Sequence, residues 1–153
     1  MKRWKGGWLG ALAALSMLPA HAQSVIEARL AGQLFQLELA IKPDIRRHGL
    51  MERDALASNT GMLFDFPEGT RPAIWMRNML IPLDLLFVDE DARVAHIFSE
   101  VPPCSAPPCA IYRADEPLRF VIEVPAGTAA ELDLKPGDQL DLGGHQLSPP
   151  PPF

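Results

Sequence analysis

Three polar side chains interrupt the most apolar stretch of the chain outside its N-terminal region. The stretch runs from Ile74 to Asp89, and the three polar residues are Arg77, Asn78 and Asp84. A guanidinium and an amide bind carboxylate or carbonyl groups, and an indole ring such as that of Trp75 supplies an apolar wall. We therefore expect a ligand site on this stretch. The predicted ligand-binding residues are Trp75, Arg77, Asn78, Asp84 and the bordering Arg53.

A β-hairpin from Ala73 to Asp89 would position these side chains. If its bend centres on residues 80–81, Arg77 lies opposite Asp84 on the neighbouring strand. A directly opposed ion pair contributes about 0.2–1 kcal/mol, so a structural cross-strand pair is the alternative to a ligand site. Both interpretations stay open, because a register shift of one residue would place the two side chains on opposite faces.

Cys104 and Cys109 are separated by four residues. In an oxidising compartment a close pair of cysteines is expected to form a disulfide. A redox-active pair has two intervening residues and opens a helix, whereas the prolines between residues 102 and 108 prevent a helix here. We predict a structural disulfide, which would stabilise the fold by about 2 kcal/mol in the chain-entropy treatment.

Signals of an enzyme are few. The sequence has no nucleophile elbow, no zinc-protease helix motif and no phosphate-binding glycine loop. Asp65, Asp84 and Glu123 could in principle act as paired carboxylates, but their spacing does not indicate that they meet. We predict no catalytic residue, and the alternative is a hydrolase-like enzyme that uses Asp84 or Glu123 with an arginine.

Glu123 lies in the middle of a predicted strand, between Ile122 and Val124. A buried carboxylate without a cation would be costly. The side chain therefore either faces solvent, which we expect, or is buried against an arginine. The candidate arginines are Arg53, Arg71 and Arg77.

Methionines and histidines raise the question of copper, because thioethers suit Cu(I). The residues are Met51, Met62, Met76, Met79, His48 and His96. No two of them form a Met-x-Met or His-x-His pair, and most of the methionines lie in apolar segments where filling gaps in the core is their ordinary role. We predict core packing, no metal site and no cofactor.

The elements that would carry these residues are short strands separated by turn signals. Predicted strands cover residues 25–30, 34–40, 61–66, 93–98, 118–124 and 139–142, besides the hairpin. Short helices are predicted from about Pro43 to Met51 and from about Ala126 to Leu134, and Thr128 with Glu131 has the spacing of a capping box. The pattern predicts a mainly β domain, a compact antiparallel sandwich or barrel with two short helices.

Several ordered blocks resemble the DUF192 family (also called UPF0127). They are Gly49-Leu50-Met51 with Arg53, Gly61-Met62-Leu63-Phe64, Trp75-Met76-Arg77-Asn78 and Ile81-Pro82-Leu83-Asp84. The cysteine pair and Tyr112 fit the same pattern. The resemblance implies a jelly-roll-like β fold in a small protein of a family with many exported members, and it implies no established activity.

The N-terminus has the parts of a signal peptide. Lys2, Arg3 and Lys5 precede an apolar run from Trp8 to Leu18, and Ala20-His21-Ala22 is a small-x-small cleavage site. An uncleaved membrane anchor is the alternative. Cleavage after Ala22 would leave 131 of the 153 residues in the periplasm or outside the cell. We predict one domain over residues 23–147 and a disordered proline-rich tail over residues 148–153.

The net charge of the chain limits the classes of partner that we expect. The formal net charge is −5, and removal of the three basic residues of the signal peptide would lower it to −8. Nucleic acid and anionic membrane surfaces attract basic patches, so neither is an expected partner. We predict an exported binding or accessory module for a small ligand or peptide, of open oligomeric state. A structural envelope protein whose tail recruits a partner is a further alternative.

Overall fold

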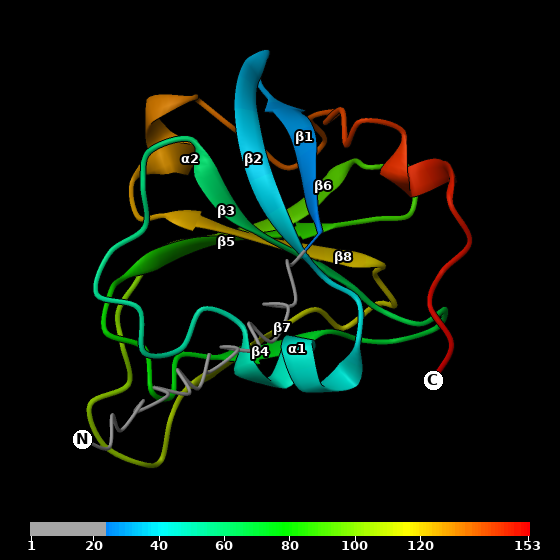
Figure 1. Ribbon diagram of the computed structural model, residues 1–153. Coiled ribbons are helices and arrows are strands. Elements are labelled where there is room, and N and C mark those ends of the chain that lie inside the picture. The colour runs from blue at the N-terminus through cyan, green and yellow to red at the C-terminus, as the bar shows by residue number, and fades with distance from the viewer. Residues whose placement is uncertain (1–23) are drawn as a thin grey trace, which may run out of the picture.

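A computed structural model of the protein describes residues 24–153 (Figure 1). The elements in chain order are β1 (Val25–Leu30), β2 (Gln33–Ala40), α1 (Pro43–His48), β3 (Thr60–Asp65), β4 (Ala73–Trp75), β5 (Leu83–Val88), β6 (Val94–Val101), β7 (Ile111–Arg113), β8 (Phe120–Pro125), α2 (Thr128–Glu131) and a 3₁₀ turn η1 (His145–Leu147). The predicted signal peptide and its cleavage site lie outside the described residues. Among residues 24–153, no helix is long and apolar enough to cross a membrane.

Six strands form a central sheet in the order β1-β2-β3-β8-β5-β6, and β4 pairs with β7 in a second, two-stranded sheet. Five of the six strand pairings are antiparallel, and β2 pairs with β3 in parallel because α1 connects them as a crossover. The predicted mainly β fold with two short helices is confirmed. The central sheet is mixed rather than purely antiparallel, and the sheets do not close into a barrel.

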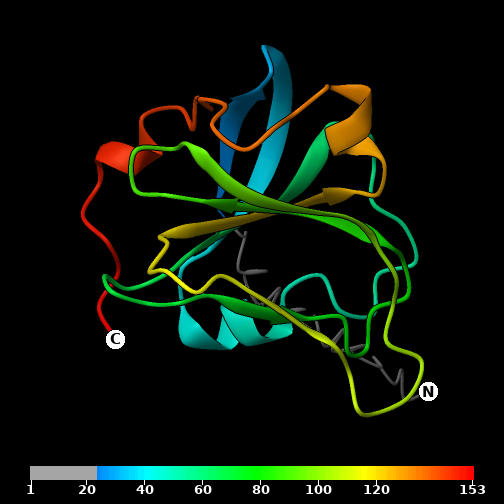
Figure 2. The same ribbon diagram turned by 180° about the vertical axis from the view of Figure 1, so that it is seen from behind.

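Apolar side chains cover both faces of the central sheet. On β8, Phe120, Ile122 and Val124 belong to one core cluster, whereas Val121 belongs to the other. The first cluster packs beneath α2 and the segment that follows it, and the second packs against α1 and the β4–β7 sheet. Figures 1 and 2 show α1 and the small sheet together on one side of the central sheet and α2 on the other. Three layers therefore enclose two separate cores.

The predicted hairpin from Ala73 to Asp89 is wrong. β4 pairs with β7 in one layer, whereas β5 pairs with β6 and β8 in another. The chain changes layers over residues 76–82, where Asn78 has a positive φ of 57° and Pro82 cannot donate a backbone hydrogen bond. The apolar stretch is thus divided between the two walls of one core.

A buried ionic cluster holds the C-terminal part of the domain. The Arg119 guanidinium donates to both oxygens of Asp65, at 3.1 and 3.2 Å, and His145 lies 2.9 Å from the same carboxylate. Arg119 also donates to the carbonyl of Gln146 at 2.9 Å. The cluster joins η1 to β3 and β8. Residues 148–153 follow in extended conformation without regular structure, and their predicted disorder stays a prediction.

Candidate functional site

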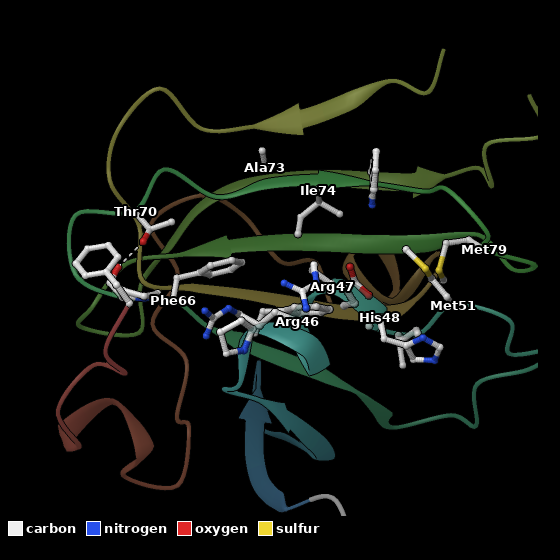
Figure 3. A pocket seen from close by; sticks show the side chains of 17 residues that line it. Arg46, Arg47, His48, Met51, Phe66, Thr70, Ala73, Ile74 and Met79 are labelled. Carbon is white, nitrogen blue, oxygen red and sulfur yellow. Dashed lines mark hydrogen bonds between the residues drawn. The ribbon is translucent and has the colours of Figure 1, made fainter. Parts of the chain in front are cut away.

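A cavity of about 710 Å³ lies between the central sheet, α1 and β4. Most of its lining is apolar: Leu50, Met51, Phe64, Phe66, Ile74, Trp75 and Met79. Figure 3 shows Arg46, Arg47 and His48 on the side of α1, with Ile74 of β4 facing them. Well-packed cores rarely hold voids larger than a water molecule, and ligand pockets measure about 300–1,000 Å³, so the size of this cavity is that of a binding site.

Glu123 is the acidic side chain that lines the cavity, and it comes from the central strand β8. The strands on either side place Met62 and Leu85 opposite it. Gly61 permits the close approach of β3, because a Cβ at this position would lie 2.2 Å from the Glu123 backbone carbonyl. The side chain of Glu123 is only 5% exposed. The alternation of β8 therefore directs a carboxyl group into the core that α1 and β4 cover.

Within residues 24–153, the Glu123 carboxyl has neither a hydrogen bond nor an ion pair to another residue. Burial alone raises its pKa to about 8. At neutral pH the group is mainly protonated, because removal from water disfavours the charged form. A protonated carboxyl has one O–H donor and an acceptor oxygen. The apolar wall of the cavity thus contains a buried hydrogen-bonding group, Glu123, whose capacity the described residues leave unused.

The cationic side chains of the cavity come from α1. Arg46, Arg47 and His48 occupy the last turn of the helix, where positive charge complements the helix dipole. Arg46 donates to the carbonyl oxygens of Ile41 and Asp65 and lies over the Phe66 ring at 5.5 Å from its centroid. Arg47 and His48 are exposed. Arg46 therefore fixes α1 to the sheet, and Arg47 and His48 lie at the border of cavity and solvent.

Among the residues predicted to bind a ligand, Trp75 lines the cavity, and its side chain is 47% exposed. Arg77 is exposed and lies over the Trp75 ring, 5.5 Å from its centroid. Asn78 is exposed too; its backbone carbonyl accepts a hydrogen bond from the Glu52 amide at 2.9 Å, and its side-chain nitrogen is 3.9 Å from the Met51 sulfur. These three residues lie together at one edge of the cavity, and ligand binding by them stays a prediction.

The other two predicted ligand-binding residues, Arg53 and Asp84, are hydrogen-bonded to groups of the protein itself. Arg53 forms a two-pronged pair with Glu38 at 2.5 and 2.7 Å, and this hydrogen bonding raises its pKa. Asp84 is fully buried on the other face of the central sheet, where it accepts hydrogen bonds from the amides of Glu100, Gly127 and Ala129 at 2.7–3.2 Å. The predicted Arg77–Asp84 pair is therefore wrong: Asp84 caps α2.

The expectation that Glu123 faces solvent is also wrong, and no arginine pairs with it among the described residues. Each candidate arginine has another position: Arg53 binds Glu38, Arg77 stacks on Trp75, and Arg71 donates to the Asp115 carbonyl at 2.7 Å. The sequence did contain a signal. Residues 120–124 are apolar apart from Glu123, and a nearly continuous apolar run is typical of a strand buried on both faces.

The cysteine prediction is confirmed, since Cys104 and Cys109 form a disulfide. It lies on the connection between β6 and β7, next to a backbone bond from the Cys104 amide to the Met76 carbonyl at 2.9 Å. Met62, Met76 and Met79 are core residues, as predicted. Among residues 24–153, no group of three or more His, Cys, Asp and Glu side chains could hold a metal ion.

Two solved structures resemble this chain along most of its length. One, described as a "putative transcription regulator" from Sinorhizobium meliloti, is 36% identical with a TM-score of 0.74, and the match covers 82% of this chain and 98% of that one. A protein of unknown function from Novosphingobium aromaticivorans is 32% identical with a TM-score of 0.72, and the match covers 89% and 99%. No curated protein matches. Residues 25–142 match DUF192, described as "Uncharacterized ACR", and the chain belongs to this family.

Proposed function

We propose that the protein is a binding module whose cavity takes a small, mostly apolar molecule. The observation that supports this is a cavity of about 710 Å³ whose wall contains the buried, unpaired carboxyl of Glu123. An apolar residue of similar volume would remove the cost of burying that carboxyl. A polar group kept in such a place is typical of ligand pockets, where a few polar groups orient the ligand against apolar walls.

The cavity supports binding better than hydrolysis. Asp84 cannot join Glu123, because it lies on the opposite face of the sheet and binds three backbone amides. Asp65 is held by Arg119 in the ionic cluster. Within residues 24–153, Glu123 is thus the one carboxylate side chain that lines the cavity. General acid–base hydrolysis with two carboxyl groups would need a second one.

We further propose that the module works outside the cytoplasm, in the periplasm or secreted. The signal-peptide pattern of residues 1–22 and the pairing of both cysteines support this location. The relative from Sinorhizobium meliloti is described as a regulator of transcription. For the present chain, the net charge of −5 argues against direct contact with nucleic acid.

Trp75 provides the test of cavity binding. Cleavage after Ala22 would remove Trp4 and Trp8, so that Trp75, at the cavity, would be the only tryptophan of the exported protein. An apolar dye that binds the cavity should quench Trp75 by energy transfer, with one dye per chain. Ile74 lines the cavity and points into it in Figure 3, so Ile74→Phe would fill part of it.

The matched control is Ile97→Phe, since Ile97 lies on β6, packs against the core on the other face of the central sheet and does not line the cavity. We expect the dye to bind Ile74→Phe at least about tenfold more weakly than it binds the wild type and Ile97→Phe, which corresponds to about 1.4 kcal/mol. Equal binding by all three proteins, or no saturable binding by the wild type, would contradict the proposal.

A further inference from the structure

The charged groups of the cavity are distributed unevenly between its wall and its mouth. The charged or titratable side chains of the described lining are Arg46, Arg47 and His48 on α1 and Glu123 on β8. Since Glu123 is buried and mainly neutral, the arginines make the cavity positive in a chain whose net charge is −5. A local positive field in an acidic protein selects anionic partners at short range.

Arg47 is the cation that can meet a ligand. Arg46 is half-buried, and it is held against the sheet because its Nη1 donates to the carbonyl oxygens of Ile41 and Asp65 and its guanidinium carbon lies 5.5 Å from the centre of the Phe66 ring. Arg47 is exposed, and its guanidinium has no ion pair or hydrogen bond to any residue between 24 and 153. A guanidinium has five N–H donors and binds a carboxylate through two parallel hydrogen bonds. In Figure 3 the Arg47 and His48 side chains both lie at the α1 side of the cavity.

The interior of the cavity favours a different part of a ligand from the one that its mouth favours. Phe64, Ile74 and Met79 offer an apolar surface, so an ionic group that entered this region would lose its hydration without compensation. Glu123 in its protonated form offers a donor to a carbonyl or ether oxygen. An anion is favoured only at the mouth, and a neutral acceptor is favoured inside.

We propose that the ligand is an amphipathic monoanion, with its acidic head group at Arg47 and His48 and its apolar body in the cavity, where an acceptor oxygen meets Glu123. This inference rests on the proposed binding function. It assigns the chemical class of the ligand: an aliphatic or aromatic acid that carries a carbonyl or ether oxygen along its apolar part. The head group remains accessible to solvent, and the acceptor oxygen satisfies the buried donor.

A series of ligands with different head groups tests the first half of the inference, the contact of the acidic head group with Arg47 and His48. Decanoate, decanol and decylammonium share one apolar body. Each is titrated into the dye-loaded protein, which is used in the form in which the cell produces it. We expect decanoate to displace the dye at the lowest concentration. Arg47→Gln should weaken decanoate about tenfold and leave decanol unchanged, because it removes one charge-assisted pair. Arg113→Gln is the matched control, since Arg113 is exposed on β7 and does not line the cavity.

A second series tests the contact with Glu123. Keto derivatives of decanoate, with the carbonyl at successive carbons, are compared with decanoate itself. We expect one position to bind several-fold more tightly, an advantage that Glu123→Gln retains, because an amide also donates, and that Glu123→Leu removes. An equal advantage in Glu123→Leu would overturn this half of the inference.

The possible failures can be distinguished. Tighter binding of decylammonium than of decanoate would identify Glu123 as the counter-ion of a cation, and equal binding of decanol would remove the role of Arg47. Either result overturns the inference while the cavity still binds. If the dye itself does not distinguish Ile74→Phe from Ile97→Phe, the proposed function fails and the inference fails with it.

Discussion

Glu123→Gln should change how the stability of the protein depends on pH. In the unfolded chain the carboxyl has its ordinary pKa of 4.5, and burial in the fold raises the pKa to about 8. Between these values the folded protein binds more protons than the unfolded chain. The free energy of unfolding therefore falls as pH rises through this window and levels off above it. Glutamine has a similar shape and does not titrate, so the variant lacks this component.

The size of the effect follows from the two pKa values. One pKa unit corresponds to about 1.4 kcal/mol, so the range from 4.5 to about 8 gives a loss of about 5 kcal/mol at the alkaline end. Domains of this kind unfold at a cost of about 5–15 kcal/mol, so the loss is a large share of the total. The other charged or titratable side chains of the cavity are Arg46, Arg47 and His48 of α1, and the flanking strands place the uncharged Met62 and Leu85 beside Glu123.

The assay is urea unfolding of wild type and Glu123→Gln at several pH values between about 5 and about 9. Glu90→Gln is the control, because Glu90 is exposed on a turn. We expect the stability of the variant to rise relative to that of the wild type by about 1.4 kcal/mol for each pH unit up to about 8, with no such trend in the control. A difference that is constant with pH, or that shrinks as pH rises, would refute a buried, neutral Glu123.

Three further predictions concern groups that hold the fold. Arg119→Met leaves the Asp65 carboxylate buried without its guanidinium and should cost about 3–5 kcal/mol in urea unfolding; an effect below about 1 kcal/mol would contradict the buried pair. Asp84→Ala leaves the amides at the start of α2 without their acceptor and should cost about 1–3 kcal/mol, with faster amide exchange of Ala129, and unchanged exchange would argue against the cap. Replacement of Cys104 and Cys109 by serine should lower stability by about 2 kcal/mol and leave dye affinity unchanged; weaker dye binding would link the disulfide to the cavity.

Local patterns were sufficient to predict the class of fold. Alternation of apolar and polar residues marked β2, and Pro43 marked the start of α1. Helix lengths were overestimated at both sites. α1 ends at His48 because Gly49 has a positive φ of 53°, and α2 extends only from Thr128 to Glu131. The strand and the start of the helix depend on neighbours in sequence, so they can be found from the sequence alone, whereas the ends of the helices were not.

Contacts between strands and helices that are far apart in the sequence decided the features that the sequence analysis did not predict. The apolar stretch around Trp75 suggested a hairpin, but Trp75 pairs with Ile111, and such a partner is set by the packing of whole layers. Thr128 looked like the cap of α2, yet its hydroxyl donates to the Pro125 carbonyl and the amides bind Asp84 instead.

The sequence by itself determined a mainly β domain with a disulfide and a set of residues with the chemistry to bind a ligand, because composition and local periodicity record which groups can be buried. Only the tertiary structure decided which of them share a cavity. In the tertiary structure Asp84 lies away from Arg77. Glu123, which was expected to face solvent, lies inside an apolar core. Burial depends on the strands and helices that cover a residue, and in this fold β3, β5, α1 and β4 come from four separate parts of the chain.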